Sequence, residues 1–403
     1  MRRLIYIFII GLLLCSYTWA DGSRYASKSL LSEGKWVKIR VDKTGIYKLS
    51  YADLKNMGFS DPSKVSVHGY GGWPLDEDFS KEYIDDVPST PVWRGSDYLL
   101  FYGKGPVKWE YDSSSQTFVH TNNPYSLYGY YFVTDATPTN DMTSVAQASG
   151  ATNRITTYDD YLVHEQELVS LAKSGRELYG EDFSGATPRT LSTFSSIPGI
   201  TNEDAKVTMS FVSKVTSGTG VASLSINQSN VLDVSIRSNR EEYVKALEGV
   251  STAVWKGEKS EKNSVVVSYN SASHNNVRLN YVRLHFKRTL QPYGAYTFFR
   301  SIASIGNVSR FVVQGANANT LVFDVTDAQR VRLMETELNG SELTFSIPAG
   351  TLREFVLVRT DQSFISPEVV GEVENQNLHA LEQKDMIIIA AKAFQTQAER
   401  LAE

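Results

Sequence analysis

The chain has 403 residues, of which 41% are hydrophobic and 21% are charged, so it is long enough for two or three domains with cores of their own. Its 40 Lys and Arg residues against 45 Asp and Glu residues give a formal net charge of -5. This balance excludes the basic surface that is typical of nucleic-acid-binding proteins.

The first 20 residues have the pattern of a secretory signal peptide. Arg2–Arg3 precede an apolar run over residues 4–14, and Ala20 before Asp21 gives the predicted cleavage site. The alternative is a retained membrane anchor, but the run is shorter than the ~20 residues that a spanning helix needs. Cleavage would remove Cys15, which is the only cysteine, and would leave an exported protein without a thiol.

Residues 21–185 are predicted to form a first, β-rich domain. Over residues 36–49, apolar and polar side chains alternate on both sides of a turn, which is typical of a half-buried hairpin. Ser50 follows in the position of a helix cap, with Asp53 three residues later and Gly58 as a left-handed stop. A short helix is therefore expected directly after the hairpin.

The rest of this domain is dense in aromatic residues up to Asp135, and turn residues separate them, so short strands of a β-sandwich are expected. Residues 134–154 are predicted to form a long surface loop and residues 161–183 a charged connection. The aromatic run Tyr125–Phe132 has two interpretations. It is either a stacking platform for sugars or ordinary strand packing, and alternation favours packing because it buries half of these rings.

Residues 186–370 are predicted to form a second β-sandwich, of the jelly-roll or immunoglobulin-like type. Apolar residues alternate over residues 224–236 and again over residues 343–347. Over residues 277–286 the apolar phase slips by one position, which indicates a bulge. Asn339-Gly340 predicts a tight hairpin turn.

The pattern changes in residues 371–403. Residues 386–390 are an unbroken apolar run, and Phe394, Ala398 and Leu401 follow at helical spacing. This order predicts the first strand and helix of an α/β domain, in which a buried strand needs a parallel neighbour after a right-handed crossover. We therefore expect the chain to be one piece of a longer protein.

No side-chain pattern in residues 21–403 predicts a catalytic, cofactor-binding or metal site, and no cofactor is expected. The six histidines (His68, His120, His164, His274, His285 and His379) lack the pairwise spacing of a zinc-binding helix. His285 lies between Arg283 and Lys287, which predicts a solvated strand face.

Two further patterns suggest ligand binding only weakly. Residues 69–72 are rich in glycine, but Trp73-Pro74 follows where a phosphate-binding loop would start a helix, so a turn is expected. The carboxylate pairs Asp85–Asp86 and Asp159–Asp160 lack the alternating acidic loop of a calcium site.

From about residue 34 to residue 403 the chain resembles the signal peptidases and sortases of the type IX secretion system, whose peptidase domain is gingipain-like (family C25). Several segments carry the resemblance in one order: GKWVKIRVDKTGIYKLSYADLKNMGF (34–59), DYLLFYGKGPVKWEYD (97–112), NPYSLYGYYFVTD (123–135), HEQELVSLAKSGRELYGEDF (164–183), FDVTD (323–327) and NQNLHALEQKDMIIIAAKAFQTQAERLAE (375–403). The chain departs from the family at Leu178–Tyr179, where an aromatic pair is expected, and at Phe323, where relatives tend to carry Trp.

For the complete protein the resemblance implies a Cys-His dyad in an α/β peptidase domain, which residues 375–403 only begin. The thiolate would cleave the sorting domain from exported cargo, and an amine of surface lipopolysaccharide would capture the acyl-enzyme. The present residues would then be a non-catalytic platform at the outer membrane that docks a PorV-type β-barrel and other attachment-complex subunits. The alternative is a stand-alone surface binding module or an accessory subunit of the secretion apparatus.

Overall fold

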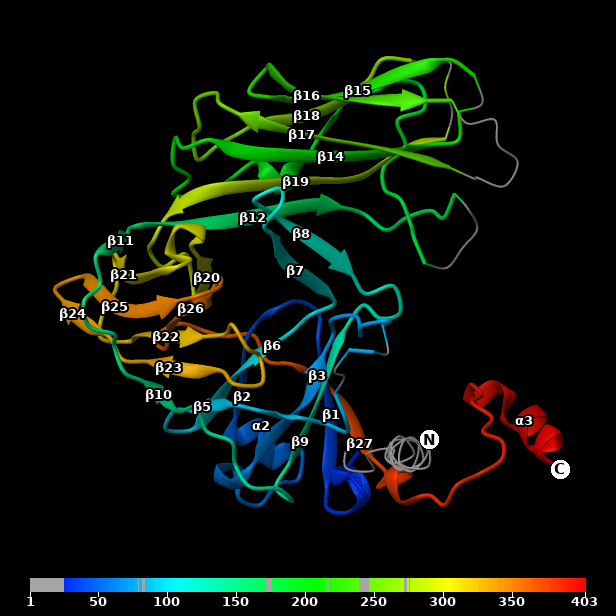
Figure 1. Ribbon diagram of the computed structural model, residues 1–403. Coiled ribbons are helices and arrows are strands. Elements are labelled where there is room, and N and C mark those ends of the chain that lie inside the picture. The colour runs from blue at the N-terminus through cyan, green and yellow to red at the C-terminus, as the bar shows by residue number, and fades with distance from the viewer. Residues whose placement is uncertain are drawn as a thin grey trace, which may run out of the picture.

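The computed structural model describes residues 25–78, 80–81, 84–171, 176–215, 217–238, 246–271, 274 and 276–403. The predicted signal peptide, with its cleavage site at Ala20–Asp21, lies outside these residues. Strands account for 46% of the chain and helices for 9%, which confirms the predicted mainly-β class. Figure 1 shows several stacked sheets, with the C-terminal segment extending away from them.

Two sheets form the N-terminal part of the molecule. The five-stranded sheet has the order β27 (Glu368–Val373), β1 (Trp36–Val41), β9 (Gly129–Thr134), β3 (Ser66–Gly71) and β4 (Ser89–Thr90). The three-stranded sheet has the order β2 (Gly45–Ser50), β6 (Tyr98–Gly103) and β5 (Val92–Arg94). The predicted hairpin residues therefore enter two different sheets, because β1 pairs with β9 while β2 pairs with β6.

The short helix predicted after Ser50 is confirmed. Helix α2 (Tyr51–Asn56) begins after Ser50, whose hydroxyl accepts the backbone N–H of Asp53 and donates to the Asp53 carboxylate. Leu54 is its buried residue, and Gly58 has a φ of 93°. A left-handed conformation of this kind favours glycine at a helix C-terminus.

A nine-stranded sheet runs through the molecule. Its order is β10 (Ser144–Val145), β23 (Arg332–Met334), β22 (Thr320–Asp324), β26 (Glu354–Arg359), β20 (Tyr296–Arg300), β12 (Thr157–Glu165), β19 (Val277–Thr289), β14 (Ala205–Ser213) and β17 (Leu247–Trp255). Two four-stranded sheets complete the β layers: β11 (Asn153–Ile155), β21 (Asn307–Val313), β25 (Glu342–Ala349) and β24 (Glu337–Asn339), and β13 (Arg189–Thr190), β18 (Val265–Tyr269), β15 (Thr219–Ile226) and β16 (Ser229–Arg237).

The remaining elements are short. A two-stranded hairpin joins β7 (Val107–Asp112) to β8 (Thr117–Asn122), and helix α3 (Gln395–Ala402) lies near the C-terminus. The 3₁₀ turns are η2 (Leu30–Ser32), η3 (Pro62–Lys64), η4 (Ser192–Phe194), η5 (Ile302–Ser304), η6 (Leu378–Ala380) and η7 (Lys392–Phe394). Of the helices in the described ranges, none combines the length and apolarity that crossing a membrane requires.

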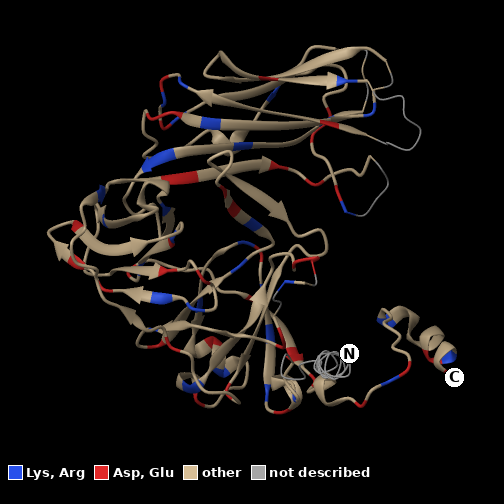
Figure 2. Cartoon of the chain, in the orientation of Figure 1, with Lys and Arg blue, Asp and Glu red and all other residues tan. Residues whose placement is uncertain are grey.

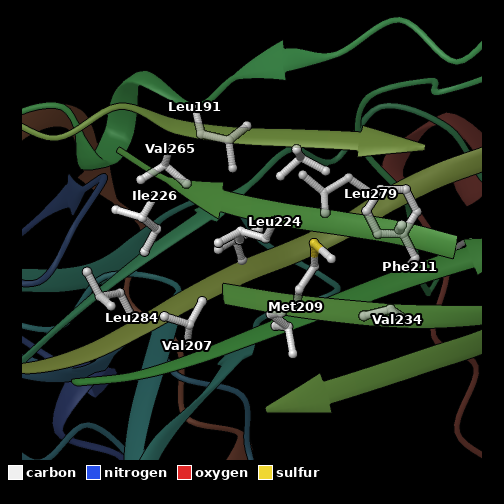
Figure 3. Packing of buried hydrophobic residues seen from close by; sticks show 14 of the residues in the cluster. Leu191, Val207, Met209, Phe211, Leu224, Ile226, Val234, Val265, Leu279 and Leu284 are labelled. Carbon is white, nitrogen blue, oxygen red and sulfur yellow. The ribbon is translucent and has the colours of Figure 1, made fainter. Parts of the chain in front are cut away.

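The largest buried cluster lies between the β13–β18–β15–β16 sheet and the β14–β19 part of the nine-stranded sheet (Figure 3). Leu224 and Ile226 of β15 belong to this cluster together with Met209 and Phe211 of β14. The predicted bulge is confirmed, because Ser210 pairs with Tyr281 while Phe211 pairs with Leu279. Because the bulge adds one residue to β19, the apolar side chains before it and after it face the same core.

Strands β2 and β6 bury both of their faces. Alternate residues, such as Tyr47 of β2 and Phe101 of β6, enter the core that these strands share with the five-stranded sheet. Their neighbours Ile46, Leu100 and Tyr102 enter a second core with residues of β22 and β26. A strand covered on both faces reads as a continuous apolar run, which explains the sequence YLLFYG of β6. This shared core joins the N-terminal sheets to the nine-stranded sheet.

The predicted domain boundaries at residues 185 and 370 stay predictions. Strand β12 lies before residue 185 but pairs with β19, and β27 spans residue 370 and pairs with β1. The hairpin predicted at Asn339-Gly340 is confirmed, and its two-residue turn is Gly340-Ser341, since Asn339 pairs with Glu342.

Four local predictions need correction. The predicted strand at residues 386–390 is wrong, because these residues form no strand and Ile389 is 95% exposed. An apolar strand needs hydrogen-bonding neighbours and cover on both faces, and none lies beside this segment among the described residues. The predicted loop 134–154 contains β10 and the start of β11, and part of the predicted connection 161–183 belongs to β12. The glycine-rich turn at residues 69–72 is instead mostly the bulged end of β3.

Candidate functional site

The hairpin β7–β8 lies on the outer face of β12 and β19, and aromatic side chains hold it there. Trp109 stacks on Tyr161 of β12 with ring centroids 4.0 Å apart and an interplanar angle of 18°. Phe118 of β8 contacts Tyr161 and meets His285 edge-on, at centroid distances of 5.1 and 5.0 Å. Large rings in such contacts stabilise the junction by apolar burial and by favourable ring geometry.

A buried carboxylate, Asp159, lies beneath this junction. His285 Nε2 lies 3.0 Å from one of its oxygens, while Lys287 Nζ and the backbone N–H of Ile302 donate to the other at 2.8 and 2.7 Å. Burial alone would raise the pKa of Asp159, but the His285 and Lys287 interactions outweigh burial and hold this pKa below its usual value. The carboxylate is therefore ionised and paired in the folded protein.

Arg300 is the most buried cation of the junction, with a side chain only 1% exposed. Its Nε lies 2.6 Å from Glu354 Oε1, and its Nη1 donates to the Asp159 carbonyl at 3.1 Å. Asp160 lies 3.7 Å from Arg300 and forms a closer ion pair with Arg288, at 2.8 Å. Figure 2 shows the acidic stretch of β12 directly beside the basic end of β19. These charges balance one another, which indicates a structural network.

The histidines lie in separate places. The prediction that His285 lies on a solvated face is wrong, because the β7–β8 hairpin covers that face and His285 is only 9% exposed. His120 Nε2 lies 3.0 Å from Glu165, and His164 lies between Thr193 and Glu181, at 2.9 and 2.6 Å. No group of three or more His, Cys, Asp or Glu residues within the described ranges has a geometry that could hold a metal ion.

A large groove lies beside the hairpin and is the candidate functional site. Its volume is about 1070 Å³. Residues of the N-terminal sheets and residues of the nine-stranded sheet both line it. One wall comes from the end of β3 and from the connection between β8 and β9, and includes Tyr70, Trp73 and Tyr125. The other wall comes from the region after β12 and from β17 and β19, and includes Glu167, Tyr179, Glu248 and Tyr281.

The second wall of the groove is acidic. Glu165 is held by His120 and by the Asn122 amide, which also donates to Glu167 at 3.1 Å. Burial and the neighbouring charges of Glu165 and Glu177 raise the pKa of Glu167. Burial, with Glu177 and Glu248 close by, raises the pKa of Tyr179 to about 12. The carboxylates of Glu165 and Glu177 therefore lie close enough to Glu167 to disfavour its ionisation.

Comparison with known proteins shows what the chain is similar to. No protein-family model matches its sequence, and no curated protein matches it. Among solved structures, 94% of the chain superposes on dimeric latent PorU from Porphyromonas gingivalis, with a TM-score of 0.87 and 32% sequence identity. The chain is PorU-like. It spans 37% of the length of that PorU structure.

Two other solved structures resemble the PorU-like chain only faintly. BuGH86wt in complex with neoagarooctaose matches 64% of this chain and 32% of its own, at a TM-score of 0.21 and 10% identity. A Listeria monocytogenes EGD-e protein in complex with glucose, magnesium and calcium matches 63% of this chain and 19% of its own, at a TM-score of 0.21 and 9% identity. Likeness at this level does not inform the fold or the function.

The PorU-like groove contains only some of the residues that the sequence pointed to. In the aromatic run, Tyr131 is buried, while Tyr128 and Tyr130 lie under the cations of Arg40 and Lys38. Tyr125 is 80% exposed and lines the groove. Packing therefore accounts for Tyr131, as alternation predicts, and Tyr125 has the exposure that a stacking platform needs.

The two departures from the family have different surroundings in this PorU-like fold. Phe323 is fully buried in the core shared with β2 and β6, where an apolar side chain is required. Leu178 and Tyr179 line the groove. Sequence reasoning missed the groove's acidic wall because Glu248 of β17 lies far along the chain from Glu165 and Glu177 and meets them only in the folded chain.

Proposed function

We propose that this PorU-like chain is the non-catalytic β platform of a type IX secretion sortase at the outer-membrane surface. The single observation that carries the proposal is the similarity to PorU over 94% of the chain, at 32% identity. In the complete protein, a gingipain-like cysteine peptidase domain cleaves the C-terminal sorting domain from exported cargo and transfers the cargo to lipopolysaccharide. Its partners are cargo proteins, a PorV-type β-barrel and other attachment-complex subunits.

The chemistry that we propose for the complete protein is acyl transfer. A cysteine thiolate attacks the carbonyl carbon before the sorting domain, the peptide C–N bond breaks, and a histidine protonates the leaving amine. An acceptor amine then attacks the thioester and releases the thiolate, or water does so and frees the cargo. We place the catalytic Cys and His outside residues 21–403, since the only cysteine of the chain is Cys15 in the predicted signal peptide.

Cargo processing in the source bacterium tests the proposal. Deleting the segment that encodes residues 36–373 should leave exported cargo with its sorting domain still attached. The measurement is the intact mass of surface and periplasmic cargo, with the wild-type gene restored as control. Cargo that is processed normally without this segment would refute the proposed role. Purified residues 21–403 should show no hydrolysis of a sorting-domain peptide, and hydrolysis would show that the active site has been misplaced.

The groove favours a second candidate, a surface binding module or an accessory subunit of the secretion apparatus. A cavity of about 1070 Å³ with exposed aromatic and carboxylate side chains is suited to a ligand. The same cell experiment separates the two candidates. A binding module alone would leave cleavage of the sorting domain intact and change only what the cell surface retains.

A further inference from the structure

The groove is too large and too charged to be an ordinary gap between sheets. Its volume of about 1070 Å³ is at the upper end of the range for small-molecule pockets, and residues from β3, β8, β12, β17 and β19 all line it. Its rim also exposes apolar side chains, namely Leu75 at 66% and Tyr125 at 80%. A surface with these properties is suited to an extended ligand that contacts both walls.

Acidic residues outnumber basic residues in the lining of the groove, although Lys81 pairs with Asp76 at 2.7 Å. Seven carboxylate residues line it (Asp76, Glu77, Asp86, Glu165, Glu167, Glu177 and Glu248), and the only Lys or Arg among its lining residues is Arg176, which pairs with Glu77. Within the described residues, no Lys or Arg forms an ion pair with Glu165, Glu167, Glu177 or Glu248. The pKa of Glu167 is raised, first by burial and then by its acidic neighbours. A bound cation would relieve this repulsion.

Aromatic rings of the groove already hold cations from the chain itself. The Lys104 ammonium lies 4.0 Å from the centroid of Tyr70 and 4.6 Å from that of Trp73. The Arg283 guanidinium lies 5.1 Å from the centroid of Tyr281. Tyr125, in contrast, is exposed and has no cation over its ring within the described residues. A ligand cation can therefore stack on it as the chain's own cations do elsewhere.

We infer that this groove binds an extended, Lys- or Arg-rich polypeptide segment, which places its cations against Glu167, Glu177 and Glu248 and over Tyr125. A neutral glycan would leave the carboxylates unbalanced, and a phosphate-bearing lipid headgroup would be repelled. The site goes beyond the proposed function and does not depend on it, since peptide binding to the purified chain and cargo processing in cells are separate measurements.

Fluorescence anisotropy with a labelled nonapeptide of alternating Lys and Thr tests the inference. The triple variant Glu167→Gln, Glu177→Gln and Glu248→Gln should raise the Kd about tenfold, because three exposed ion pairs are lost. Glu335→Gln, an exposed carboxylate in the connection between β23 and β24, is the matched control and should leave the Kd unchanged. Raising the salt concentration from 50 mM to 500 mM should also raise the Kd of the wild-type chain, because salt screens exposed ion pairs.

Other results would overturn the inference. A Glu-Thr nonapeptide that binds as tightly as the Lys-Thr peptide would exclude charge recognition. An unchanged Kd in the triple variant, with native circular dichroism, would place peptide binding elsewhere. Saturable binding of neutral maltoheptaose that Tyr125→Ala abolishes, together with no binding of the Lys-Thr peptide at millimolar concentration, would assign the groove to glycans.

Discussion

Replacing Arg300 by Met tests how the charged junction stabilises the fold. The substitution keeps an unbranched apolar side chain over Tyr161, whose ring centroid lies 4.4 Å from the guanidinium carbon, and removes the charge. Asp160 retains Arg288 at 2.8 Å, so Glu354 is the carboxylate left without its partner. Breaking a buried pair costs about 3–5 kcal/mol, and Glu354 is 28% exposed, so we expect about 3 kcal/mol of lost unfolding free energy.

Urea unfolding followed by tryptophan fluorescence and by circular dichroism measures this loss and tests whether both probes report one transition. Adding Glu354→Gln to Arg300→Met should recover about 2 kcal/mol, because the unpaired charge is then removed. Arg330→Met is the matched control, since this arginine is 85% exposed and should change stability by less than about 0.5 kcal/mol. A loss below about 1 kcal/mol for Arg300→Met, or a double variant less stable than the single one, would refute the reasoning.

Three further predictions concern the same fold. Asp159 has a lowered pKa in the folded chain, so its ionised carboxylate stabilises the fold above pH ~4, and this stabilisation is lost as the pH falls further. The melting temperature of Asp159→Asn should therefore fall less steeply than that of wild type between pH ~4 and ~2. Burial lowers the pKa of Lys104 to about 8, so stability should rise between pH ~8 and ~10, and Lys104→Met should remove this rise in urea titrations. Deleting Asn280 removes the bulge but leaves Leu279 and Val282 on the same face of a regular strand, so cooperative unfolding should be retained in calorimetry, whereas inserting one alanine after Val282 turns Leu284 away from the core and should abolish it.

Local sequence signals predicted local structure well. Ser50 and Gly58 bound a helix because capping and a left-handed stop depend on adjacent residues alone. The slip in apolar phase near Asn280 predicted a bulge because one face of β19 must stay buried. The mainly-β class followed from the same short-range alternation.

Long-range pairing could not be predicted in this way. The alternation around β1 and β2 is compatible with one hairpin, yet the two strands pair with β9 and β6, which lie far along the chain. His285 has the sequence surroundings of an exposed residue because both of its near neighbours on that face are basic. Only the folded chain brings the β7–β8 hairpin over it.

The same long-range packing explains how the groove can have a defined shape. Its two walls come from parts of the molecule that a shared core joins, through Ile46, Leu100 and Tyr102 of β2 and β6. The stack of Trp109 on Tyr161 joins them a second time beside the groove. Because folding has already brought the walls together, a ligand does not have to order them, and more of its contact energy contributes to affinity. Weakening the Trp109 contact should therefore reduce peptide affinity without altering any carboxylate of the acidic wall.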